Sequence, residues 1–389
     1  MSLRFHWFLP TQGDGRGLIE TGEPAPLGVA GGLRSPSLPY LSQIATAAED
    51  LGFEAALTPT GGWCDDAWVV TGMLSQLSER LKFLIAFRPG IVSPTMAAQM
   101  AATFQWHSKG RLLLNVVTGG DADEQRNYGD YLDKDDRYVR TGEFLEIVRR
   151  LWAGERVDFQ GEHLRVDGAT IHRLPDPLPE IYFGGSSPIA GEIAAEHVDS
   201  YLTWGEPPAA VEEKIARVRE LAAKRGRELR YGIRLHVIAR DRSEDAWAEA
   251  DRLLSTVSPE MVERVQDKLR RSESVGQRRM LELHGGSRRD LEVSPNLWAG
   301  VGLGRGGAGT ALVGSHEEVA DRIQEYAAAG IDEFVMSGYP HLEELYWFGE
   351  GVLPILQNRG LWQNPDQKNL SGTSGRAGTA VPFAVGASR

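Results

Sequence analysis

The sequence predicts an α/β fold, and within that class a closed (β/α)8 TIM barrel with insertions. Short runs rich in apolar residues alternate with segments of helical periodicity. The runs are almost continuously apolar, which is typical of parallel strands covered by helices on both faces. Eight strand–helix pairs follow one another, and eight pairs are the number that closes such a barrel. An open, doubly wound sheet is the alternative arrangement.

The expected elements run from the N-terminus to residue 356. The first helix is marked by Ser37 as its N-cap, by Pro39 in its first turn and by an apolar stripe from Leu41 to Leu51. The strands are expected at Leu3–Leu9, Phe53–Leu57, Leu81–Phe87, Arg111–Val117, Glu180–Phe183, Asp199–Thr203, Tyr231–Ala239 and Asp332–Met336. The helices are expected after Ser37 and at Asp65–Leu77, Pro94–Ser108, Val139–Trp152, Pro188–Glu196, Pro208–Arg225, Glu244–Leu254 and His341–Leu356.

Two insertions interrupt this alternation. The segment 119–137 is polar and rich in aspartate, and the segment 256–309 is long enough to form a lid or a binding loop. A hairpin that turns at Gly161 is expected over 155–166. The sequence therefore predicts one barrel domain over residues 1–360 and a flexible tail rich in small residues at 366–389.

Composition excludes several classes of protein. Of the 389 residues, 41% are hydrophobic and 25% are charged, as in ordinary globular proteins, and the net charge of −12 argues against nucleic acid or an anionic membrane surface as a partner. Cys64 is the single cysteine, so no intrachain disulfide forms. No transmembrane run or signal peptide is recognised, and a cytoplasmic location is expected.

Most catalytic and metal-binding motifs are missing. The sequence has no Walker A pattern, no HExxH motif and no EF-hand loop, so no metal site is expected. The segment Gly184–Pro188 (GGSSP) also lacks the last glycine of a nucleophile elbow.

That segment has a second interpretation as an anion site. Gly185, Ser186 and Ser187 follow a strand and begin a helix, where backbone N–H groups and the helix dipole favour a phosphate. Simple capping of the helix by Ser186 or Ser187 is the alternative.

Arg234 and His236 are the most unusual pair in the sequence. They lie two residues apart in an otherwise apolar strand, so both side chains face the same side. Charged residues in such strands are rare without a partner or a function, which favours an active-site role. The alternative is a buried salt bridge together with a core histidine.

Further candidates lie where strands end or loops begin. The glycine-rich run Gly300–Gly309 is either a hinge or a loop that delivers Arg305 to a site. Cys64 follows the second strand and reads most simply as a small buried residue. Trp204 and Tyr339 end strands, where aromatic rings either pack or stack on a flat cofactor.

Several long motifs together resemble the flavin-dependent alkanesulfonate monooxygenases of the bacterial luciferase superfamily. The similarity extends from about residue 3 to about residue 356. The motifs that carry it are Phe8–Gly15, Pro59–Trp68, Arg88–Thr95, Val116–Gly119, Tyr182–Ser187, Leu202–Pro208, Gly232–Ile238, Ser294–Gly314 and Ser337–Glu344.

The resemblance implies a luciferase-like barrel that converts an alkanesulfonate and oxygen into an aldehyde and sulfite. Reduced FMN would come from a separate NAD(P)H-dependent FMN reductase, and the chain would form a homo-oligomer, a tetramer in this family. By motif match, the catalytic residues would be Arg234, His236, Arg305 and Tyr339. The residues near the flavin would be Cys64, Thr118, Tyr138, Gly185, Ser186, Ser187 and Trp204.

Three departures from the family pattern bear on the substrate. Gln12 stands where a histidine is common, Trp63 replaces a small residue beside Cys64, and the segment Gly15–Ser37 is longer than usual. Gln12 and Trp63 favour a sister monooxygenase acting on a sulfone or another organosulfur compound as one alternative. Hydride transfer with a deazaflavin is a second alternative, and a flavin-binding protein without turnover is a third.

Overall fold

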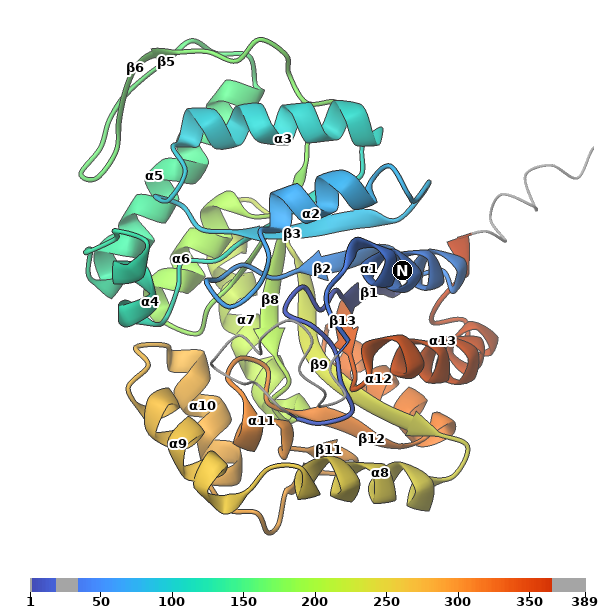
Figure 1. The fold of residues 1–389 in the computed structure, drawn as a ribbon. Coiled ribbons are helices and arrows are strands. Elements are labelled where there is room, and N and C mark those ends of the chain that lie inside the picture. The colour runs from blue at the N-terminus through green and yellow to red at the C-terminus, as the bar shows by residue number, and fades with distance from the viewer. Residues whose placement is uncertain (1, 19–33, 366–389) are drawn as a thin grey trace, which may run out of the picture.

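Eight parallel strands form a closed barrel in the computed structural model, which describes residues 2–18 and 34–365 (Figure 1). Each strand pairs with the next, and β13 pairs with β1 to close the ring. The predicted barrel is confirmed, and the open sheet is wrong. The expected tail at 366–389 lies outside the described residues. The barrel strands are β1 (Arg4–Phe8), β2 (Ala55–Thr58), β3 (Lys82–Phe87), β4 (Leu112–Val116), β7 (Glu180–Gly184), β8 (Ser200–Trp204), β9 (Arg230–Arg240) and β13 (Glu333–Ser337).

Helices surround the barrel at the places that the sequence predicts. Local signals set their ends: in α3, Ser93 accepts a hydrogen bond from the Met96 amide and Pro94 begins the helix. Apolar side chains on their inner faces pack on the outside of the barrel. These helices are α1 (Leu38–Asp50), α2 (Ala67–Leu74), α3 (Pro94–Ser108), α5 (Lys134–Trp152), α6 (Pro188–His197), α7 (Pro208–Lys224), α8 (Ser243–Ser255) and α13 (His341–Asn358).

The insertions contain secondary structure of their own. Segment 119–137 includes α4 (Ala122–Asn127), and the expected hairpin is formed by β5 (Val157–Gln160) and β6 (Arg165–Ala169). Segment 256–309 lies beside the barrel in Figure 1. It contains α9 (Pro259–Arg270), α10 (Val275–His284), β10 (Glu292–Ser294), β11 (Leu297–Trp298) and α11 (Val301–Gly304).

The sequence prediction missed one strand–helix pair, β12 (Ala311–Ser315) and α12 (His316–Ala328). β12 pairs with residues 236–240 of β9, beyond the point where β8 ends. The length of β9, eleven residues, provides this extra edge. β12 is thus an addition to the eight barrel strands.

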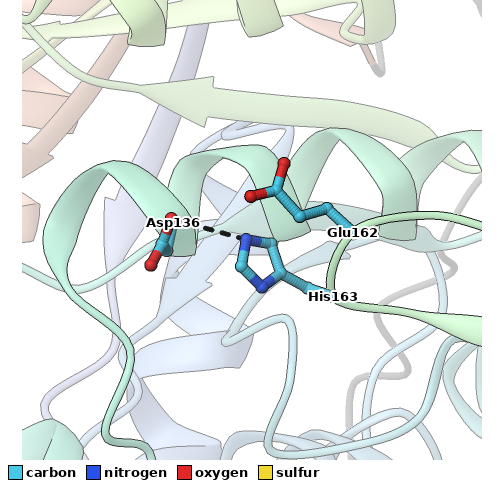
Figure 2. A group of neighbouring side chains, drawn as sticks. All are labelled: Asp136, Glu162 and His163. Atoms are coloured by element: carbon cyan, nitrogen blue, oxygen red, sulfur yellow. Dashed lines mark ion pairs between the residues drawn. The ribbon is translucent and has the colours of Figure 1, made fainter.

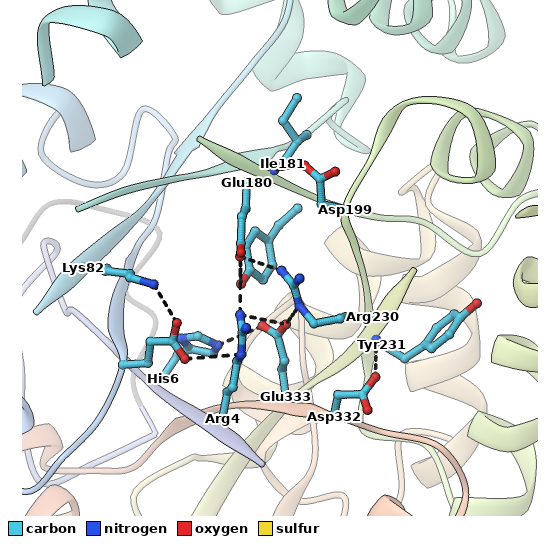
Figure 3. A network of polar contacts seen from close by, with 12 residues as sticks. Arg4, His6, Lys82, Glu180, Ile181, Asp199, Arg230, Tyr231, Asp332 and Glu333 are labelled. Carbon is cyan, nitrogen blue, oxygen red and sulfur yellow. Dashed lines mark hydrogen bonds and ion pairs between the residues drawn. The ribbon is translucent and has the colours of Figure 1, made fainter. Parts of the chain in front are cut away.

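Charged side chains fill the N-terminal end of the barrel (Figure 3). We call this group the floor network: Arg4, His6, Glu54, Lys82, Tyr182, Glu180, Arg230 and Glu333. Glu333 accepts hydrogen bonds from His6 Nε2 (3.0 Å) and Arg230 Nε (2.5 Å), and Glu180 accepts one from Arg230 Nη2 (2.5 Å). Each carboxylate therefore has a cationic partner.

Candidate active site

The C-terminal half of β9 holds Arg234 and His236, which are both buried. The Nη1 group of Arg234 donates to Ser337 Oγ (2.8 Å) and to the carbonyl oxygen of Leu235 (2.9 Å). Its guanidinium also lies over the ring of Phe8, 4.6 Å from the centroid. Among the described residues Arg234 has no carboxylate partner, so the buried salt bridge considered as the alternative is not found in that part of the chain.

His236 belongs to a directional chain of hydrogen bonds. Its Nε2 lies 3.1 Å from the carbonyl oxygen of Ala308, which only accepts, so Nε2 carries the proton. Its Nδ1 therefore accepts from Ser337 Oγ (2.7 Å), which in turn accepts from Arg234. Burial, followed by the charges of Arg234 and Arg305, holds the pKa of His236 well below its usual range. The imidazole is neutral at pH 7.

The long insertion delivers Arg305 to the same place. Arg305 follows α11 and donates through Nη1 to the hydroxyl of Tyr339, which follows β13. The ring of Tyr339 stacks on His236, with centroids 5.4 Å apart and planes at 17°. His341 lies edge-on to Tyr339 at 5.5 Å. We call Arg234, His236, Arg305, Tyr339 and His341 the mouth cluster.

The mouth cluster is electropositive. Burial lowers the pKa of Arg234, and the nearby charge of Arg305 lowers it further. Burial and the same two arginines also keep the pKa of His341 well below its usual range, so this imidazole is neutral as well. Two guanidinium groups beside neutral imidazoles form a site suited to an anion.

A second group of predicted residues meets at the start of α6. Ser187 caps this helix and accepts from the Ala190 amide (3.4 Å). The hydroxyl of Tyr138 bonds the Ser187 side chain. A Cβ atom on Gly185 would lie 2.6 Å from the Ala190 Cβ and 3.1 Å from the Tyr138 hydroxyl oxygen, so only glycine leaves this backbone accessible. This helix start offers free N–H groups and hydroxyls to a phosphate.

The insertion also covers this second group. A Cβ on Gly276 in α10 would lie 3.2 Å from the Trp204 ring and 3.6 Å from Ser186 Oγ, so α10 passes close to both residues. An ion pair from Arg279 to Glu206 ties α10 to the loop after β8. Trp204 and Ser186 therefore lie against a segment about 70 and about 90 residues farther along the chain, respectively.

Thr118 and Cys64 lie at the C-terminal ends of other strands. Among the described residues, the buried hydroxyl of Thr118 has no hydrogen-bond partner, and neither has that of Thr58, which was not predicted from the sequence. Such orphaned donors are typical of groups that face a ligand. Cys64 donates its thiol to the Gly61 carbonyl oxygen (3.5 Å), and burial raises its pKa to about 12. The thiol is therefore not an activated nucleophile.

Besides Thr58, the structure adds three functional candidates to those that the sequence marks. Ser337 links Arg234 to His236, His341 flanks Tyr339, and Asp14 contacts the start of α13. Ser337 and His341 lie within Ser337–Glu344, one of the motifs that carry the family resemblance. Membership of this motif is the sequence signal that could have identified them. Asp14 lies in another such motif, but nothing in its neighbourhood along the chain reveals its partners.

One cluster outside the mouth has the composition of a metal site. Asp136, Glu162 and His163 place their ligand atoms within 4.8 Å of one another, where the hairpin meets α5 (Figure 2). The contact between them is an ion pair of 3.6 Å from His163 Nε2 to Asp136 Oδ1.

Within residues 2–18 and 34–365, none of the helices combines the length and apolarity that crossing a bilayer requires.

Several solved structures have folds similar to this chain. A riboflavin lyase solved with modified FMN and riboflavin has a TM-score of 0.77 and 21% identity, covering 96% of each chain. DmoA from Hyphomicrobium sulfonivorans has a TM-score of 0.75 and 20% identity, covering 94% of this chain and 90% of its own. EDTA monooxygenase from Chelativorans sp. BNC1 has a TM-score of 0.72 and 16% identity, covering 94% and 96%. At these identities the likeness shows the fold.

The sequence itself provides the assignment. Residues 3–333 match the profile of the luciferase-like monooxygenases, which is most of the barrel and the whole long insertion. The chain belongs to the luciferase-like monooxygenase family.

Proposed function

We propose that the protein is a two-component FMN-dependent monooxygenase that desulfonates alkanesulfonates. Alkanesulfonate, O2 and reduced FMN would give aldehyde, hydrogen sulfite, oxidised FMN and water. The observation that carries the proposal is the buried guanidinium of Arg234, which has no carboxylate partner among the described residues. A buried cation without an anionic partner is costly, and an anionic substrate relieves that cost.

The residues at the start of α6 fit the FMN phosphate. The accessible backbone at Gly185, the capping Ser187 and the Tyr138 hydroxyl would hold the phosphate, and Trp204 offers an aromatic face nearby. The orphaned hydroxyls of Thr58 and Thr118 fit the polar edge of a flavin. Bound reduced FMN would supply the electrons that activate dioxygen.

The mouth cluster would bind and orient the sulfonate. Arg234 and Arg305 donate forked hydrogen bonds that suit a tetrahedral anion. His236, neutral and held by Ser337 and Ala308, would position the anion or move a proton. The Tyr339 hydroxyl accepts a hydrogen bond from Arg305. Tyr339 would therefore keep the guanidinium charge of Arg305 in place while the insertion excludes water.

The proposal includes a partner and an assembly. An NAD(P)H-dependent FMN reductase would deliver the reduced flavin, and the working form would be a cytoplasmic homotetramer. Sedimentation of the purified protein would measure its oligomeric state, and sulfite formation should depend on the reductase when only oxidised FMN is supplied.

The function is tested by mixing the protein anaerobically with reduced FMN and then admitting oxygen and octanesulfonate. Sulfite should form well above the amount seen with free reduced flavin. Arg305→Ala should reduce sulfite release by at least about a hundredfold, which is typical for loss of one charged donor, while the circular dichroism spectrum is unchanged. Sulfite at the free-flavin level in the wild type would contradict the proposal.

A sister monooxygenase of a sulfone or another organosulfur compound is the second candidate. Two observations favour it: Trp63 is 44% exposed beside Cys64, and the buried side-chain oxygen of Gln12 has no hydrogen-bond partner within the described part of the chain. A panel that pairs sulfonates with neutral sulfones of equal chain length decides between them. Faster turnover of the sulfones would favour the second candidate.

A further inference from the structure

Asp14 is a buried carboxylate beside the mouth cluster that the proposed chemistry does not use. Its Oδ1 accepts from the amide of Gly15 (2.8 Å), and its Oδ2 accepts from the amide of His341 (2.8 Å) and from the Tyr40 hydroxyl. Its backbone forms a two-way bridge with Arg34, at 3.0 and 2.6 Å. Asp14 therefore joins the β1 loop, the first turn of α1 and the start of α13.

Helix α13 depends on this contact for its cap. Its N-cap residue is Pro340, which has no side-chain acceptor. The first amide of the helix, that of His341, is an orphan donor that an acceptor must satisfy. Asp14 supplies the acceptor from 327 positions away, and its negative charge also suits the positive end of the helix dipole.

The start of α13 carries two members of the mouth cluster. Tyr339 accepts from Arg305 and stacks on His236, and the ring of His341 stacks on Phe8 at 5.5 Å. A shift of this turn would therefore move the phenol that receives Arg305.

The three donors around Asp14 require a carboxylate. An ionised carboxyl group only accepts, whereas an asparagine amide would turn an N–H2 group toward at least one of the donors. Burial raises the pKa of Asp14 to about 6, although the bonds from Tyr40, His341 and Gly15 and the charge of Arg34 act in the opposite direction. Because the pKa is above its unfolded value, ionisation of Asp14 lowers the free energy of unfolding as the pH rises toward 6. A residue kept for stability alone would not carry this buried charge.

We propose that Asp14 is a positioning residue of the mouth cluster, which fixes the start of α13 and thereby sets Tyr339 and Arg305 for the substrate anion. Its kinetic consequence rests on the proposed function, whereas its structural consequence does not. Three titratable groups of the described residues face Asp14: Tyr40 on α1, Arg34 in the segment before α1, and His341 on α13. Glu343 is paired to Arg34.

The structural consequence is tested by hydrogen exchange of Asp14→Asn, followed by mass spectrometry. Backbone amides in 337–345 and also in 300–310 should exchange about tenfold faster than in the wild type, as after loss of one hydrogen bond. Asp332→Asn is the matched control, since Asp332 accepts from the Tyr231 amide (3.1 Å) at the opposite end of the barrel. It should leave both segments unchanged. If Asp14→Asn does not fold, Tyr40→Phe is measured in its place. Tyr40→Phe removes one donor to Asp14, so the same amides should exchange faster than in the wild type, by a smaller factor.

The kinetic consequence is a change in the pH profile with octanesulfonate and reduced FMN. Wild-type kcat/KM should fall below about pH 6, and Asp14→Asn should lack this fall and show a KM raised more than kcat is lowered. Unchanged exchange at 337–345 would overturn the proposal, as would faster exchange confined to 337–345 with unchanged kinetics. If the wild type forms no sulfite, the proposed function fails, and exchange at 300–310 alone decides the role of Asp14.

Discussion

The two ends of the barrel interior use charge in opposite ways. In the floor network, Glu54, Glu180 and Glu333 each contact Lys82, Arg4 or Arg230, so cations and anions balance. At the mouth, Arg234 is buried beside Arg305 and has no carboxylate partner within the described residues. Both ends lie in one barrel and share the same strands.

The contrast separates charge that stabilises from charge that binds. Paired charges at the floor satisfy one another in the folded chain, and removing one partner would leave a buried charge uncompensated. An unpaired guanidinium at the mouth costs free energy until an anion arrives, as expected of a binding site.

Replacing Glu333 with glutamine should destabilise the fold strongly. The side chain is fully buried, and its removal as an anion leaves His6 without its acceptor charge and Arg230 with Glu180 alone. The expected loss is about 4 kcal/mol in the free energy of unfolding, measured by urea denaturation. Binding of octanesulfonate to the folded variant should be unchanged. A loss below about 1 kcal/mol would mean that the floor pairs contribute little, and the contrast between the two ends would fail.

Acid should destabilise the floor network through protonation of Glu333. Burial alone would raise the pKa of Glu333, but the hydrogen bonds and charges of His6 and Arg230 outweigh it and lower the pKa to about 2. Because the folded pKa is below the unfolded value near 4.3, the contribution is complete above that value and is lost as the pH falls toward 2. The free energy of unfolding should fall by about 3 kcal/mol over this range. Glu333→Gln should lack this part of the slope, and an identical slope in both proteins would contradict the assignment.

The local pattern of the chain explains which parts of this architecture could be predicted. Strand runs and helix stripes are properties of neighbouring residues, so all eight barrel strands were located from sequence. The segment Ala311–Ser315 follows a glycine-rich run and pairs with β11 and with the far half of β9, and the pattern of neighbouring residues does not mark these partners. Helices α9 and α10 lie in a polar segment and were also missed, although the apolar residues of α9 recur with a helical period.

The same distinction between local patterns and long-range contacts applies to the residues of the candidate site. Arg234 and His236 stand out because two polar residues interrupt an apolar strand, and this signal is local. The contact of Asp14 with His341 joins residues 327 positions apart, which no local pattern encodes. The pairing of Arg305 with Tyr339 was likewise visible only once the fold placed the insertion over the barrel.

Arg234→Met should weaken binding without weakening the fold. The variant loses a donor to the anion, so the affinity for octanesulfonate in the presence of reduced FMN under nitrogen should fall about a hundredfold. Relief from the charge of Arg305 offsets the lost bond to Ser337, and the free energy of unfolding should change by less than about 1 kcal/mol.

Arg111→Met is the matched control for this variant. Arg111 is also buried and donates to the carbonyl oxygens of Ser108 (2.7 Å) and Ser75 (2.5 Å), where β4 begins. It should destabilise the protein and leave sulfonate affinity unchanged. Equal loss of stability in both variants, or unchanged affinity in Arg234→Met, would remove the distinction between the two ends.

The smallest effect is expected at Cys64, which lies at the mouth end and carries no charge. Because burial raises its pKa to about 12, the thiolate fraction near pH 7.5 is only about one in thirty thousand. Iodoacetamide should therefore leave the native protein unmodified, as intact mass shows, while the protein in urea is alkylated fully. Cys64→Ala should change the free energy of unfolding by less than about 1 kcal/mol and sulfite formation by less than about threefold. Rapid alkylation of the native thiol, or a tenfold loss of activity, would place a reactive anion at the mouth and would mean that its chemistry does not depend on the guanidinium groups alone.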